Sequence, residues 1–169
     1  MTPHSHPSSL PAKRLAAAPI LAILGLLSGP AHALLAECSA STSGVSFGTY
    51  DVFSPAPLDG NGAISVNCTG LVASVLVSYD LLLSPGGSGS YLSRTLANGS
   101  SQLAYNLYTD SARTGIWGDG GSGTSKVSDG YLLGLFTVAK DYPVYGRIPA
   151  LQNAATGSYA DTIIVTVNY

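Results

Sequence analysis

The stretch Tyr159–Tyr169, Tyr-Ala-Asp-Thr-Ile-Ile-Val-Thr-Val-Asn-Tyr, has the clearest strand pattern in this chain of 169 residues. One of its faces carries an apolar or aromatic residue at every second position: Ile163, Val165, Val167 and Tyr169. Period-two alternation with β-branched residues predicts a half-buried β-strand. No turn follows it in the sequence. We therefore expect this strand either to lie inside a completed sheet or to leave an edge with which another chain can pair.

The first 33 residues have the features of a secretory signal peptide. Lys13 and Arg14 precede an apolar run of about a dozen residues, and Ala31-His32-Ala33 fits a small-residue cleavage site. The run is too short to span a membrane, and no later segment approaches the length of a transmembrane helix. We expect export, removal of residues 1–33, and an exported mature domain of residues 34–169.

The mature region is acidic and contains few charged residues. Its five lysines and arginines stand against nine carboxylates, a net charge of about −4. This balance argues against nucleic acid or an anionic membrane as the partner, because both require a basic surface. Glycine, serine, threonine and tyrosine are plentiful, which favours an extracellular all-β protein.

The two cysteines of the chain are Cys38 and Cys68. In an exported protein an even count indicates a disulfide, and two cysteines allow a single pairing. Closing a loop of this size contributes roughly 3 to 4 kcal/mol in the chain-entropy description. Free thiols or metal ligands are the less favoured alternative, since the mature region has nothing else to complete a Cys/His metal site.

Short strand-like runs alternate with turn-rich stretches, and no linker divides the mature region, which favours one β-sandwich or barrel. We expect breaks at residues 55–62, 84–89 and 118–123, where prolines and glycines gather, and no amphipathic helix. The expected strands before the terminal one are Val45–Asp51, Ala63–Cys68, Val75–Leu83, Tyr91–Leu96, Gln102–Tyr108, Tyr131–Ala139 and Val144–Ile148.

Enzymatic chemistry has little support in these residues. All histidines, His4, His6 and His32, lie in the region expected to be removed, so no imidazole is left for a catalytic triad or a metal. Oxidised cysteines offer no thiolate. Two carboxylates could in principle cleave a glycoside, but the aspartates stand mostly beside glycines or at strand ends, where turns use them. We predict no catalytic, cofactor-binding or metal-binding residues.

Three further features each have a functional and a structural interpretation. Asp119–Gly123 lacks the alternating oxygen ligands and closing glutamate of an EF-hand, so a solvated turn is favoured over a calcium loop. Trp117 could bind a ligand, although aromatic residues more often pack a sandwich core. Arg94 and Arg113 flank an expected strand, and exposed ion pairs stabilise little, so neither is assigned a role.

Several sequence blocks occur along the mature region in a fixed order. They are Cys38, Phe47–Asp51, Val66–Gly70, Leu103–Asp110, Trp117–Asp119, Val144–Pro149, Gly157–Tyr159 and Asp161–Tyr169. Together they resemble the spore coat protein U domain family, which includes the Csu-type subunits of archaic chaperone–usher pili. The resemblance extends over essentially the whole mature region.

The resemblance implies an immunoglobulin-like β-sandwich that lacks its last strand. It also implies three partners: a periplasmic chaperone that lends a strand, an outer-membrane usher, and neighbouring pilin subunits whose N-terminal arm replaces the lent strand by β-strand addition. Ile163, Val165, Val167 and Tyr169 would then line the strand-acceptor groove. A missing strand would bury about five apolar side chains at roughly 1.5 to 3 kcal/mol each, comparable with the stability of a whole domain. We expect the isolated domain to be fragile.

The N-terminal region departs from the pattern of a repeating pilin. If cleavage follows Ala33, four residues precede Cys38 and reach about 13 Å, whereas a ten-residue donor strand spans about 33 Å. We therefore expect a chain that accepts a strand but donates none of normal length, as in a tip or minor subunit or a coat protein that does not polymerise.

The sequence thus leads to the hypothesis of an exported, non-enzymatic structural subunit of a surface pilus or coat. The alternative is a self-complete secreted β-sandwich that serves as a coat or binds carbohydrate or another surface. In that alternative an internal strand, such as Tyr131–Ala139, fills the groove.

Overall fold

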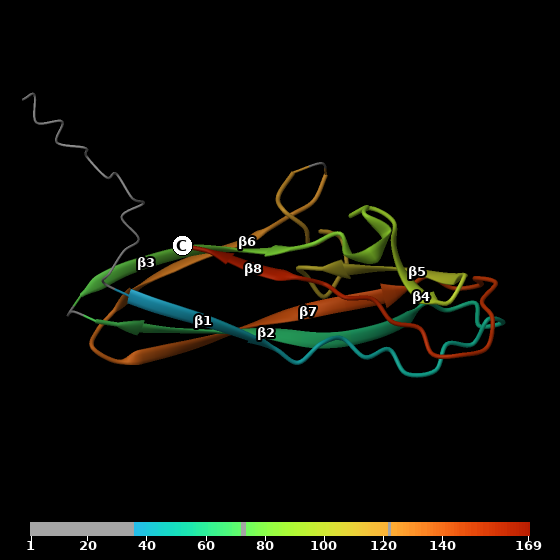
Figure 1. Cartoon of the computed structure of the whole chain (residues 1–169), viewed down its shortest axis with the longest axis horizontal. Helices are drawn as coiled ribbons and strands as arrows, with labels where there is room; N and C mark the ends of the chain where they lie inside the picture. The colour runs from blue at the N-terminus through green and yellow to red at the C-terminus, as the bar shows by residue number, and fades with distance from the viewer. Residues whose placement is uncertain (1–35, 72–73, 122) are drawn as a thin grey trace, which may run out of the picture. The chain divides into compact units, whose positions relative to one another are not determined.

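The computed structural model describes residues 36–71, 74–121 and 123–169, and the signal peptide expected at residues 1–33 lies outside them. The described residues form antiparallel β-sheets packed as a sandwich, which confirms the predicted all-β class (Figure 1). They contain a single 3-10 turn at Gly86–Ser88 and no α-helix. No helical segment among them is long and apolar enough to cross a membrane. The strands are β1 (Ala36–Thr42), β2 (Leu58–Gly70), β3 (Val75–Leu83), β4 (Arg94–Asn98), β5 (Ser101–Tyr108), β6 (Val127–Leu133), β7 (Thr137–Ile148) and β8 (Val165–Asn168).

The two sheets differ in width. The larger sheet has five strands in the order β1-β2-β7-β5-β4, and the smaller sheet has three in the order β6-β3-β8. Figure 1 shows β3, β6 and β8 lying over the layer that contains β1, β2 and β7. The terminal strand of the chain is therefore an edge strand of the narrower layer.

The core lies between the sheets and is built from alternate positions of the strands, as period-two patterning requires. In β3, for example, Leu81 and Leu83 are buried while Leu82 is only partly so. Trp117 is fully buried, and its indole N–H donates a hydrogen bond to the carbonyl of Leu81 at 3.0 Å. This confirms the interpretation of Trp117 as a core residue. The buried apolar side chains are Ile64, Val66, Cys68, Val77, Tyr79, Leu81, Leu83, Leu103, Tyr105, Leu107, Trp117, Leu133, Val144 and Ile148.

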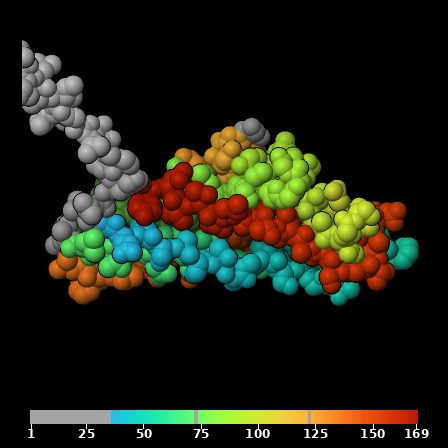
Figure 2. Space-filling model, viewed as in Figure 1, coloured from blue at the N-terminus to red at the C-terminus, as the bar shows by residue number. Residues whose placement is uncertain are grey.

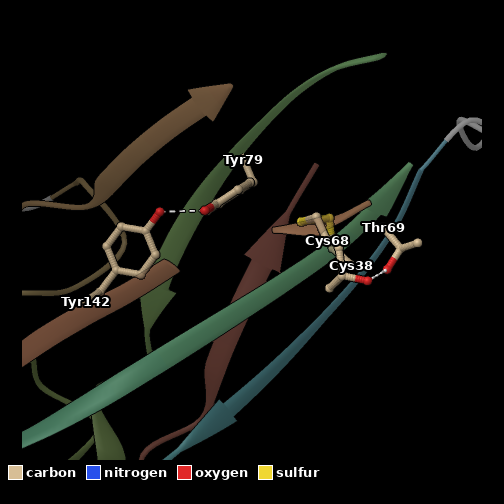
Figure 3. The surroundings of a disulfide bond; sticks show 6 residues. Cys38, Cys68, Thr69, Tyr79 and Tyr142 are labelled. Carbon is tan, nitrogen blue, oxygen red and sulfur yellow. Dashed lines mark hydrogen bonds between the residues drawn. A yellow bond between two sulfur atoms is a disulfide. The ribbon is translucent and has the colours of Figure 1, made fainter. Parts of the chain in front are cut away.

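The predicted disulfide is present between Cys38 and Cys68. The two cysteines are direct cross-strand neighbours in the antiparallel pair of β1 and β2. Figure 3 shows the bond joining these two strands at one end of the larger sheet. Among the described residues β1 pairs with no strand other than β2, so the disulfide anchors an edge strand that has one neighbour.

Most expected strands coincide with observed ones. β3 and β5 match the predictions closely, and the expected strands Ala63–Cys68 and Val144–Ile148 lie within the longer β2 and β7. The strand expected at Tyr91–Leu96 begins later, at Arg94. The strand expected over Tyr159–Tyr169 has regular pairing only in β8, preceded by an isolated bridge between Ala160 and Ala97.

Three sequence-based boundaries are wrong. Val45–Asp51 is not a strand and makes one bridge, from Ser46 to Asn61. The break expected at 55–62 is too long at its C-terminal end, because β2 already begins at Leu58. The glycines of this stretch, Gly60 and Gly62, lie within the strand and pair with β7. Tyr131–Ala139 is not one strand: its start belongs to β6 and its end to β7. Its nearly continuous apolar run hides the turn between these strands. Strand β1 was not predicted from the sequence, because its inner face carries only small residues.

A polar network joins the two sheets on the side away from β8. The hydroxyl groups of Tyr79 and Tyr142 are hydrogen-bonded at 2.5 Å, as Figure 3 shows, and Tyr142 also donates to Asp129 at 2.7 Å. The ammonium of Lys140 donates to the same carboxylate at 2.7 Å. These hydrogen bonds, first from Lys140 and then from Tyr142, lower the pKa of Asp129 below its usual value.

This network predicts a pH dependence of stability. Because the folded-state pKa of Asp129 is lowered, its ionised form stabilises the fold above its unfolded-state pKa of about 4, and the stabilisation is lost as the pH falls through the folded-state value. The Asp129→Asn variant should melt below wild type at pH 7, and the gap should shrink as the pH falls below about 4. Thermal melts over this pH range measure the gap. A gap that does not change with pH would contradict the assignment.

Candidate functional site

Two sheet edges lie next to each other with unpaired outer sides. Among the described residues β1 pairs only with β2, and β8 pairs only with β3. Figure 2 shows the corresponding segments, blue to cyan and red, running side by side along one face. The peptide groups on the free side of each strand have no ladder partner, so this face has the backbone chemistry of two open edges.

The second half of the inner face of β1 is exposed, whereas Ala36 and Cys38 in its first half pack against the core. Ala40 and Thr42 stand opposite Val66 and Ile64 in the ladder and on the same face as these core residues. Val66 is 0% exposed and Ile64 is 1% exposed, yet Ala40 and Thr42 are exposed. The inner face of the larger sheet is thus buried at β2 and exposed at this part of β1. The smaller sheet is one strand too narrow to cover it.

The other wall comes from the segment that leads into β8. Ile163 and Val165 line a cavity of about 170 Å³, and Val165 pairs in register with the buried Leu83. The cavity floor is apolar and belongs to the core: Ile64, Leu83, Leu96, Tyr105, Leu107 and Val144.

Of the four residues that were expected to line a groove, two line the cavity and two do not. Ile163 and Val165 line the cavity. Val167 stands beside Leu81 and packs against the core without lining the cavity. Tyr169 is 65% exposed and lies outside it. The alternating pattern extends over all four residues, but only the first two, Ile163 and Val165, face the cavity.

The wall facing β8 is formed by residues 42–47, which the sequence analysis did not identify. After β1 this segment turns inward, and Val45 and Phe47 lie against the larger sheet at three glycines. A Cβ at Gly60 would lie 2.7 Å from the carbonyl oxygen of Ser46, and one at Gly62 would collide with the carbonyl of Gly44. At Gly146 it would lie 2.6 Å from the Phe47 ring. The glycines inside β2 and β7 are the sequence signal of this close approach.

The hollow continues beyond Phe47. A second, wider one of about 770 Å³ is lined by residues 45–53 on one side and 154–161 on the other. The ring of Phe47 meets that of Tyr105 edge-on, with centroids 6.0 Å apart. Both hollows share Val45, Phe47, Leu96 and Asp161, so together they form one groove, which we call the β1–β8 groove.

A buried polar network supports the groove from below. The Arg94 side chain is fully buried and donates to the carbonyls of Ser84 and Trp117 and to Asn106. Burial lowers the pKa of the Arg94 guanidinium. Tyr105 donates to Asp161 at 2.7 Å, and burial, with this hydrogen bond as the second cause, raises the pKa of its phenol. No role was assigned to Arg94 from the sequence, because exposed ion pairs stabilise little. The structure instead buries its side chain among backbone carbonyls and an amide.

Other charged residues perform structural tasks at the surface. Arg113 contacts Asp59 at 3.2 Å, and Asp59 also binds Arg147 through two hydrogen bonds of 2.7 and 2.9 Å. Asp119 accepts hydrogen bonds from the backbone of Gly121 and the hydroxyl of Thr124, as expected of a turn. The part of the chain that the structure describes holds no group of three or more His, Cys, Asp or Glu residues suited to a metal ion. What this face offers is an apolar groove bordered by unpaired peptide groups.

Comparisons with known proteins agree with this architecture. The model of the Spore Coat Protein U domain family matches residues 28–166. Protein U of Myxococcus xanthus is 35% identical over 133 residues, which cover 74% of this chain and 71% of that protein. The chain belongs to the Spore Coat Protein U domain family.

A solved structure shares the fold at lower identity. It is a chain of the CsuC–CsuE chaperone–tip adhesion subunit pre-assembly complex from the archaic chaperone–usher Csu pili of Acinetobacter baumannii, with a TM-score of 0.54 and 21% identity. The match covers 80% of this chain and 40% of that one. At this identity the likeness concerns the fold.

The glycine-cleared wall predicts a strong positional effect. Gly62→Ala should displace residues 42–47, because the new Cβ would collide with the backbone of Gly44, and it should cost about 1 to 3 kcal/mol as overpacking does. Gly134→Ala is the matched control, since its Cβ would meet only Phe136 at an ordinary 3.6 Å. Urea unfolding of both variants measures the difference. Equal stabilities would contradict the close approach of this segment to β2.

Proposed function

We propose that this chain is an exported structural subunit of a surface pilus or coat, and that it is completed by a strand from another protein bound in the β1–β8 groove. The observation that carries the proposal is the mismatch of the two sheets. Buried positions of β2 continue into exposed positions of β1, and within the described residues β8 has no strand neighbour on that side. An extended segment placed there would pair with an edge strand and cover Ala40 and Thr42.

Family membership and the Csu-like fold support the same function. The solved relative comes from a complex of a chaperone and a pilus tip subunit. By analogy we propose a periplasmic chaperone as the first donor of the strand, an outer-membrane usher as the site of exchange, and a neighbouring subunit as the final donor. The route requires export, for which residues 1–33 are the proposed signal. The role is structural and not enzymatic.

The energetics favour a partner strand. A Val, Leu or Ile side chain gains roughly 1.5 to 3 kcal/mol on full burial, so a few side chains entering the groove equal much of the roughly 5 to 15 kcal/mol that stabilises a domain. Because Ile163, Val165 and the cavity floor gain cover at the same time, folding and capture of the strand should be thermodynamically linked.

The alternative is a self-complete coat protein, for which the name of the family is the supporting observation. The expectation that Tyr131–Ala139 forms an internal strand that fills the groove was wrong. Tyr131 to Leu133 pair with β3 on the side away from β8, and Thr137 to Ala139 pair with β2. A coat role therefore does not remove the open groove, and a coat protein with this fold would itself need a partner strand.

Two substitutions in β8 test the proposal. Val165 faces the cavity, whereas Thr166 is exposed on the opposite face. In the native host, Val165→Asp should remove most of the chain from the fraction sheared off the cell surface, because a buried charge in the groove opposes strand binding. Thr166→Asp should leave the surface fraction near the wild-type level. Immunoblots of periplasmic and surface fractions measure both.

The milder Val165→Thr variant separates loss of assembly from loss of folding. It keeps the shape of valine and replaces one methyl group by a hydroxyl, so the chain should still reach the periplasm while its surface fraction falls. Normal surface assembly of both Val165 variants would contradict the proposed groove.

A further inference from the structure

One charged side chain lies in the groove, and its position constrains the partner. Asp161 is the only charged residue among the described residues that line the 170 Å³ cavity, and it also lines the wider hollow next to it. It precedes Ile163 and Val165 at two-residue spacing, so it stands in the same inward row. A strand that passes along this wall must place one of its inward side chains beside the Asp161 carboxylate.

The carboxylate is held in place from three directions. It accepts hydrogen bonds from the backbone N–H groups of Gly87 at 2.9 Å and Thr162 at 2.8 Å, and from the hydroxyl of Tyr105 at 2.7 Å. Gly86 has no side chain to interfere, and a Cβ there would collide with the carboxylate. The Asp161 carboxylate is therefore a hydrogen-bond acceptor held in a fixed position, and the lack of a side chain at Gly86 leaves room for it.

One acceptor position of this carboxylate is left over. An ionised carboxylate offers about four lone-pair sites, and the three hydrogen bonds occupy three of them. Asp161 is only half-buried and lines both hollows, so water reaches its side chain while the groove is open. An apolar side chain laid over it would remove that water without replacing it, which is unfavourable for a charged acceptor.

We infer that Asp161 selects a partner strand whose row of apolar side chains is interrupted at one position by a hydroxyl, that of serine or threonine. The inference rests on the proposed function. A hydroxyl supplies the missing donor and occupies no more room than an apolar side chain of the same shape. A second cation is less suitable, because the buried Arg94 already lies close enough to interact with the charge of Asp161.

A peptide scan tests this selectivity. The probe is a synthetic strand of about ten residues with valine at every inward position and lysine at every outward one. In a set of variants, threonine replaces one valine at a time. Thr and Val have the same shape, so the comparison isolates the hydroxyl. Affinities are measured by fluorescence anisotropy against the exported chain purified from a periplasm.

The expected result is a single position at which threonine binds at least tenfold tighter than valine, with weaker binding at the other positions. Lysine at that position should bind less tightly than threonine. In Asp161→Asn the preference should fall at least fivefold, because a hydrogen bond to a neutral acceptor is weaker than one to a charged acceptor. Asp141→Asn is the control: Asp141 is exposed on β7 and lines neither hollow, so the preference should persist.

The outcomes separate this inference from the function on which it rests. If the all-valine peptide binds but no position prefers threonine, or if Asp161→Asn keeps the full preference, the selectivity is overturned while strand capture stands. If no peptide binds at all, the proposed function fails and the selectivity with it. The wild-type scan is decisive even if Asp161→Asn folds poorly.

Discussion

The fold depends on a mismatch between a five-stranded and a three-stranded layer. The larger sheet presents an inner face that runs from β7 through β2 to β1, but the smaller sheet ends at β8 and leaves Ala40 and Thr42, in the second half of β1, exposed. Apolar and backbone groups that a complete sandwich would bury are exposed along this line. The strand-acceptor role proposed for the groove, the expected fragility of the isolated domain and the selectivity proposed for Asp161 all follow from this missing cover.

The elements beside the groove hold it open. The disulfide ties β1 to β2, its one strand neighbour in the part of the chain that the structure describes. Glycines in β2 and β7 allow residues 42–47 to lie against the larger sheet, which fixes one wall. The hydrogen bonds of Asp161 to Tyr105 and Gly87 fix the start of the other. A groove with both walls anchored needs little rearrangement to receive a strand, so less entropy is lost on binding.

The sequence predicted the parts of this arrangement that depend on local pattern. The all-β class, the disulfide and the inward row of Ile163 and Val165 follow from alternation and cysteine count. The sequence could not predict that Gly60 and Gly62 lie inside a strand, because glycine there is explained by the distant residues 44–46 that approach it. It also missed Arg94 and Asp161, whose roles depend on partners from loops far apart in the chain.

An incomplete sandwich should be completed by an added strand, and this can be measured directly. The exported chain, purified without a chaperone, is melted with and without a synthetic peptide of alternating valines. An incomplete sandwich should give a low melting temperature for the chain alone and a large increase that grows with peptide concentration, as linkage requires. A cooperative melt of the monomer that the peptide does not change would contradict it, because the groove would then already be complete.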